Sequence, residues 1–179
     1  MTLDVGYITK YMIEYDSGVP MSVIIGISFF VCASIVVLYR YSFDSLKFLR
    51  NASWCILVGY LFFIFCTTIL FRDAVIETHY RLLPLWSYGV LYNKLLAENI
   101  LNVLMFIPIG FFTSVGLRKR RLFKIAGIGC GISLTIEILQ LVYRRGVFNI
   151  DDIIHNTLGC VIGYGVFRLC NTILTNFTK

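Results

Sequence analysis

Long apolar runs are the feature that most restricts how this chain can fold. A helix needs ~20 predominantly apolar residues to cross the hydrocarbon core of a bilayer. Five segments of the sequence come close to or meet that length: 20–39, 54–71, 99–117, 122–143 and 152–173. Because lipid offers the backbone no hydrogen-bond partners, each run predicts a helix. We therefore predict an all-α, polytopic membrane protein, a bundle of about five transmembrane helices that forms one domain over residues 1–179.

The composition argues against several other classes of protein. Hydrophobic residues make up 58% of the chain and charged residues 15%, which is unlike soluble globular domains. The net charge of +6 comes from Lys and Arg at segment ends, so we predict no nucleic-acid partner. The six cysteines all fall within apolar runs without any metal-ligand spacing, which favours neither a disulfide framework nor a zinc site. His79 and His155 form no ligand pattern either, and we predict no metal and no cofactor.

The connections between the runs predict how the chain crosses the membrane. With five crossings, ten of the 16 Lys and Arg residues fall on one side and six on the other. Since cytoplasmic loops carry an excess of these residues, we predict that the N-terminus lies outside and the C-terminus in the cytoplasm. The longest connection, residues 72–98, contains the apolar run Leu82–Trp86 beside Tyr88. This pattern favours an interfacial or re-entrant segment.

Polar residues recur at helical spacing in the last three runs, close to ends that share one membrane face. Residues three or four apart lie on the same face of a helix. The three polar stripes consist of Asn99 and Asn102, of Glu137, Gln140 and Arg144, and of Asp152 and Asn156. Ionisable groups within a span are unfavourable unless they are paired or have a function. We therefore interpret the convergence of these stripes as a candidate functional site.

Structural interpretations of the same residues remain open. Asp151 and Asp152 suit the start of a helix that Asn149 caps. The arginine pair after the fourth run suits interfacial anchors, and the asparagines of the third run suit contacts between helices. Glu137 is the hardest to explain in this way, because a carboxylate inside a span needs a partner or a proton. Two GxxxG pairs, Gly127 with Gly131 and Gly159 with Gly163, predict close packing of the last two helices.

Several motifs, in this order, resemble the VanZ-like family of small bacterial membrane proteins. They cover about residues 50–170 and comprise Arg81-Leu82-Leu83-Pro84-Leu85-Trp86, the pattern N-xx-N-xxx-F-x-P-x-G from Asn99 to Gly110, Glu137-xx-Gln140, a basic residue at Arg144 or Arg145, and Asp151-Asp152-xxx-Asn156-xx-Gly159. The resemblance implies a VanZ-like domain in the bacterial cell membrane. It also implies a role in tolerance to the glycopeptide teicoplanin.

Three functional hypotheses follow from the residues and the resemblance. In the first, the protein binds or modifies an envelope lipid or wall precursor at the outer leaflet and so lowers sensitivity to lipoglycopeptides such as teicoplanin. Glu137 and Asp152 are then the candidate acid/base pair. The candidate ligand-binding residues are Arg81, Asn99, Asn102, Gln140, Arg144, Arg145 and Asn156.

The second hypothesis is a binding or shielding module without turnover, whose partner is a membrane lipid, a lipid-linked wall precursor or a glycopeptide. The third is a small proton-coupled transporter that uses the buried acid as a relay. All three stay open at this point, and with them the choice between catalysis and binding.

Overall fold

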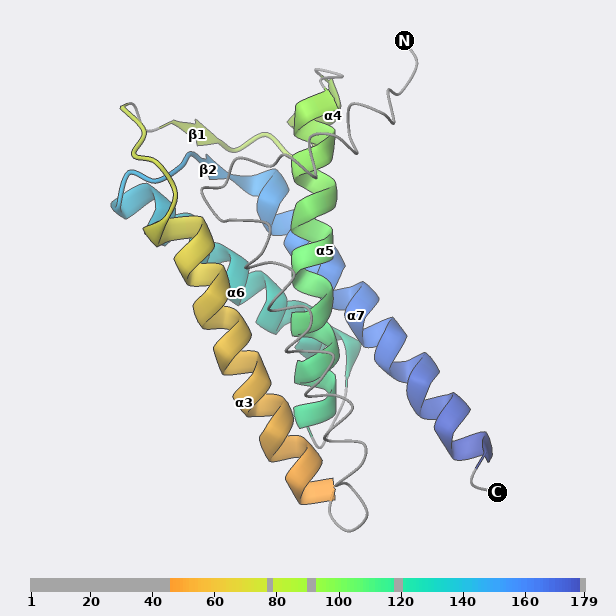
Figure 1. Ribbon diagram of the computed structural model, residues 1–179. Coiled ribbons are helices and arrows are strands. Elements are labelled where there is room, and N and C mark those ends of the chain that lie inside the picture. Colours follow the sequence, from red (N-terminus) through yellow and green to blue (C-terminus); the bar gives the residue numbers. More distant parts are fainter. Residues whose placement is uncertain (1–45, 77–78, 90–92, 118–120, 178–179) are drawn as a thin grey trace.

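The computed structural model describes residues 46–76, 79–89, 93–117 and 121–177 (Figure 1). The predicted span at 20–39 lies outside these residues. Within them, four helices are long and apolar enough to cross a membrane. They are α3 (Leu46–Phe65), which continues into the π-helical turn η1 (Cys66–Leu70), α5 (Asn93–Gly116), α6 (Leu122–Val142) and α7 (Ile150–Phe177). The predicted all-α membrane bundle is confirmed.

Close backbone contact between α5 and α7 holds the centre of the bundle together. Glycines at the contact leave no room for side chains: a Cβ added at Gly159 would overlap the carbonyl oxygen of Val103, and one at Gly163 that of Ile107. Gly110 of α5 faces the backbone of α7 in the same way. The close approach that the Gly159 and Gly163 pair predicts is therefore present.

The other predicted glycine pair does not make such a contact in the described part of the chain. Cβ atoms added at Gly127 and Gly131 would have no described neighbour within 4 Å. Between these two positions, Gly129 faces the side chain of Cys160 on α7 instead. The GxxxG spacing pointed to the wrong face of α6: at 3.6 residues per turn, Gly129 lies about 200° around the helix from Gly127 and Gly131.

The connection between the second and third predicted spans folds over one end of the bundle (Figure 1). Its two-residue strand β1 (Tyr80–Arg81) pairs in parallel with β2 (Phe148–Asn149), just before α7. The short helix α4 (Trp86–Gly89) follows. Residues 93–98, which we counted to the connection, instead form the first turns of α5. Their charged residues interrupt the apolar run but favour helix, so the helix begins earlier than the apolar pattern.

Candidate functional site

The start of α5, the end of α6 and the start of α7 lie at the same end of the bundle, as the topology of the spans predicts (Figure 1). Buried polar side chains gather there, and the 79–89 segment covers them. The buried polar residues at this end are Ser87, Asn99, Glu137, Gln140, Asp151, His155 and Asn156. Because polar groups inside a protein need partners, their hydrogen bonds define what each one does.

Asp151 fastens the covering segment to α7. Its side chain is 0% exposed. One carboxylate oxygen accepts a hydrogen bond from the backbone N–H of Leu85, and the other accepts from the backbone N–H and hydroxyl of Ser87, at 3.1 and 2.6 Å. The Ser87 hydroxyl in turn accepts from the side-chain amide of Asn99 at 3.0 Å. Asn99, a predicted ligand-binding candidate, thereby links α5 to the same connection.

Asn149 is the residue at which the network branches. Its side-chain oxygen accepts from the backbone N–H of Asp151 at 3.3 Å, as a helix cap does, and from the indole N–H of Trp86 at 3.0 Å. Its amide group donates to Asp152 at 2.8 Å, and its backbone N–H donates to Glu137 at 2.8 Å. The cap that the sequence suggests at Asn149 is present, and it also positions both candidate acids.

Glu137 and Asp152 lie close together across the α6–α7 contact, and Asn149 donates a hydrogen bond to each of them. Glu137 is only 2% exposed. An ionised carboxylate can only accept hydrogen bonds, so a proton on either group would allow the two to bond to each other. The positive charge of the Arg72 guanidinium attracts both carboxyl groups, whereas the negative charge of Glu98 on α5 repels Asp152. The result is an acid pair beside one cation.

Arg72 was not among the predicted site residues. From the sequence, we counted Arg72 only as a charge at the end of the second span. Its position could have indicated a role, because the end of that span lies on the same membrane face as Glu137. In the structure, Arg72 lies next to Gly146, where an added Cβ would come within 3.5 Å of the guanidinium. Gly146 is buried, so the turn after α6 has little room for a side chain.

The predicted arginines take other positions. Arg145 donates a side-chain hydrogen bond to the carbonyl of Arg72. Arg144 has a φ of 53°, and its carbonyl accepts from the N–H of Val75 at 2.8 Å. Arg81 lies over the ring of Trp86, 4.3 Å from its centroid. The structure therefore does not bring these three guanidinium groups together around the acid pair; Arg144 and Arg145 tie the turn after α6 to the segment after η1.

The remaining predicted residues extend the polar region along the helices. Gln140 donates to the carbonyl of Thr68 at 3.3 Å, which connects α6 to η1. One turn deeper than Asp152, Asn156 donates to the hydroxyl of Ser133 at 2.8 Å. Its side-chain oxygen is buried and has no partner among the described residues. Asn102 is half-buried on α5, one turn after Asn99.

His155 joins the same network from the other side of α7. Its Nδ1 lies 2.6 Å from the carbonyl oxygen of Asp151, so this nitrogen must carry the hydrogen. Its Nε2 lies 2.7 Å from the hydroxyl of Tyr88, whose ring stacks on the imidazole. Both ring nitrogens of His155 are therefore occupied by hydrogen bonds within the protein.

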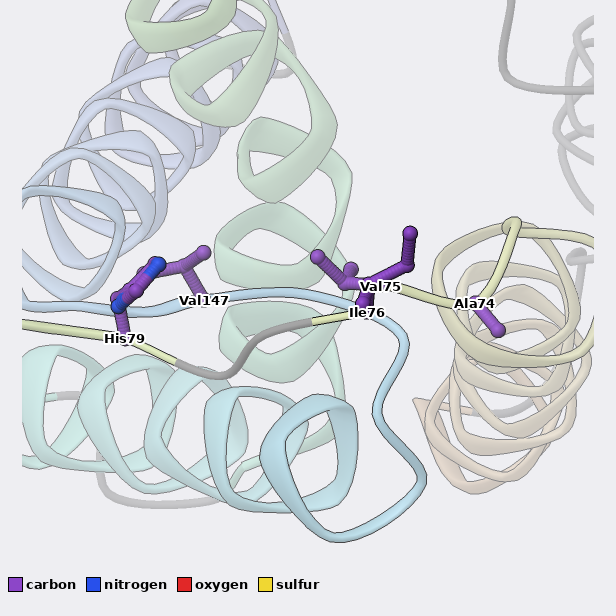
Figure 2. A pocket seen from close by; sticks show the side chains of 5 residues that line it. All are labelled: Ala74, Val75, Ile76, His79 and Val147. Carbon is purple, nitrogen blue, oxygen red and sulfur yellow. The ribbon is translucent and has the colours of Figure 1, made fainter.

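A shallow hollow open to the surface lies beside the site but holds none of the predicted site residues. Figure 2 shows its lining, which comes from the segment after η1 and from the turn before β2: Ala74, Val75, Ile76, His79 and Val147. No cluster of three His, Cys, Asp or Glu side chains suited to a metal ion occurs in the described ranges. The acid pair with Arg72 is thus the strongest chemical feature at this end. It can donate or accept a proton, and its cation can attract an anionic group.

Comparison with known proteins gives two matches. Residues 54–171 match the family model VanZ/LLP1. Over 98 residues the chain is 32% identical to Protein VanZ of Enterococcus faecium, an alignment that covers 55% of this chain and 60% of that protein. The chain thus spans less than two thirds of the length of this relative. No solved structure is significantly similar to the chain.

Proposed function

Because the chain belongs to the VanZ/LLP1 family, we propose that it acts on the bacterial cell envelope at the outer leaflet and lowers sensitivity to lipoglycopeptides such as teicoplanin. It does so by binding or modifying an envelope lipid or a lipid-linked wall precursor. Teicoplanin carries a lipid tail and acts outside the cell, so a polar site at the membrane surface is well placed to affect the drug or its target.

One observation carries this proposal: the neighbouring carboxyl groups of Glu137 and Asp152, which Asn149 joins and which lie beside Arg72 at the end of the bundle. A carboxyl pair that holds one proton can act as general acid and base, and the arginine supports binding of a phosphate group. Lipid-linked wall precursors carry phosphate at the membrane surface. The chemistry of the site and of this substrate class therefore correspond.

Susceptibility to teicoplanin tests the proposal directly. We expect expression in a sensitive Gram-positive host to raise the inhibitory concentration, and Glu137→Gln or Asp152→Asn to return it to the level of the empty host, because each replacement removes a group that can exchange a proton. Asp73→Asn is the matched control, since Asp73 is an exposed carboxylate at the same end of the bundle. Membrane levels of all forms must be equal.

Three outcomes would count against the proposal. Unchanged protection by both variants would remove the acid pair from the mechanism. No protection by the wild type would remove teicoplanin tolerance from the function of this chain. Loss of protection with Asp73→Asn as well would mean that the assay reports surface charge rather than the acid pair.

A binding module without turnover is the second candidate. It is favoured by the number of site groups that already bond to the protein itself, above all Asp151 and Asn149. Mass spectrometry of the lipids that co-purify with the protein separates the two candidates. A binder retains an unaltered lipid or precursor, whereas an enzyme converts added precursor to a product of different mass.

The proposed action outside the cell requires a defined orientation. The excess of Lys and Arg on one side leads us to expect a cytoplasmic C-terminus, so a C-terminal green fluorescent protein should fluoresce and a C-terminal alkaline phosphatase should be inactive. The site end of the bundle is opposite to the C-terminal end of α7 (Figure 1). Active phosphatase at the C-terminus would place the acid pair on the cytoplasmic face and rule out direct action at the outer leaflet.

A further inference from the structure

An apolar knuckle projects from the segment that covers the site. We define it as Leu82, Leu83, Pro84 and Leu85, which follow β1. The three leucines are 61%, 71% and 52% exposed. Contiguous exposed apolar side chains of this kind mark a surface that contacts a membrane or another protein.

Hydrogen bonds on both sides hold the knuckle in a defined position. Asp151 accepts hydrogen bonds from the backbone of Leu85 and from Ser87, immediately after the knuckle. β1, immediately before it, pairs with β2. Leu85 itself has a φ of 59°, a conformation that is unfavourable for residues other than glycine. The fold therefore fixes the leucines in their exposed position at some conformational expense.

The position of the knuckle indicates what it contacts. The segment leaves one membrane-spanning helix after Leu70 and enters the next at Asn93, so it lies where the bundle emerges from the hydrocarbon core. Next to the knuckle, the Arg81 guanidinium lies 4.3 Å from the centroid of the Trp86 ring. Apolar side chains together with Trp, Tyr and a basic residue are typical of the membrane interface. Lipid is already present at this level, whereas a soluble protein partner would have to displace it.

We propose that the apolar knuckle inserts into the leaflet at the site end of the bundle and that Arg81 binds the phosphate of an anionic lipid beside it. The inference rests on the spans and on the knuckle, and it does not depend on the role in teicoplanin tolerance. It gives the predicted interfacial segment a specific partner and assigns Arg81 to lipid rather than to the acid pair.

Tryptophan fluorescence provides the test, because the chain has two tryptophans. Trp54→Phe leaves Trp86 as the only reporter, next to Arg81. The protein is reconstituted in vesicles of phosphatidylcholine and phosphatidylglycerol whose acyl chains carry bromine, which quenches nearby tryptophans. We expect strong quenching of Trp86 and a clear loss of quenching after Leu82→Ser with Leu83→Ser. Absence of quenching in the parent, or equal quenching after the double replacement, would overturn the insertion.

The complementary reporter controls for a shift of the whole bundle. Trp86→Phe leaves Trp54, which lies in the first half of α3 and packs against Gly116 at the far end of α5. The two serine replacements should not change the quenching of Trp54. An equal loss at Trp54 would show that the replacements move the entire protein, and would overturn the assignment to the knuckle.

The role of Arg81 is tested by brominating one lipid at a time. The ratio of Trp86 quenching by brominated phosphatidylglycerol to that by brominated phosphatidylcholine measures the preference for the anionic lipid. We expect Arg81→Gln to lower this preference about fivefold, which corresponds to about 1 kcal/mol for one basic residue at an anionic membrane surface. Arg50→Gln, a replacement at the opposite end, should leave it unchanged. The same preference with and without Arg81→Gln, both in the Trp54→Phe parent, would overturn the phosphate contact.

Discussion

Replacement of Gly163 by alanine is expected to destabilise the bundle strongly. The added Cβ would overlap the carbonyl oxygen of Ile107 and approach the backbone of Phe111 on α5. Both neighbours are backbone atoms, so the two helices would have to separate. We expect a loss of about 3 kcal/mol, the upper end of the range for overpacking, measured as a lower unfolding midpoint in detergent.

Gly165→Ala is the matched control, because Gly165 lies on the same helix and a Cβ there would have no described neighbour within 4 Å. Alanine has the higher helix propensity, by up to about 1 kcal/mol, and should keep or raise stability at this position. Equal midpoints for the two variants would contradict the close contact of α5 and α7.

Asp151→Asn is expected to release the covering segment while the bundle stays inserted. The carboxylate accepts three hydrogen bonds from Leu85 and Ser87, and it is fully buried. An amide of the same size replaces one acceptor oxygen by a donor, which leaves at least one buried donor of the segment without a partner. We expect a cost of about 3 kcal/mol, seen as faster hydrogen exchange at residues 85–89 and faster proteolysis there.

Exchange in the middle of α6 reports whether the effect is local. It should remain slow in Asp151→Asn, because no contact of that part of the helix changes. Asp73→Asn serves again as the control for removal of a carboxylate at this end. Unchanged exchange at residues 85–89 in Asp151→Asn would mean that the carboxylate does not hold the segment.

The membrane bundle could be predicted from the sequence because its cause is local. Each apolar run specifies a helix by its length and composition, and alternation of direction then brings the starts of α5 and α7 and the end of α6 to one face. Which faces of two helices pack against each other is harder to predict from the sequence. Gly127, Gly129 and Gly131 are equally small, and only the position of Cys160 on α7 distinguishes the one that makes contact.

The candidate site was predictable in part for the same reason. Glu137 and Asp152 meet because each lies near the end of its span on a shared face. The position of Arg72 depends instead on the path of the chain after η1, which has no periodic pattern. Ser87 escaped as a partner of Asp151 because their hydrogen bond joins two segments that are 64 residues apart. Short polar residues in connections give no sequence signal for such contacts.

The pairing of β1 with β2 and the grip of Asp151 on Ser87 also impose an order on biogenesis. The ribosome synthesises the 79–89 segment before its partners β2 and Asp151, because α5 and α6 lie between them in the sequence. During that interval the segment has no β2 to pair with and no carboxylate to bind its backbone. The polar end can therefore assemble only after α7 has begun. A nascent chain that stops before Ile150 would contain three of the four described spans, Glu137 and the 79–89 segment, but neither Asp152 to complete the acid pair nor Asp151 to hold the segment.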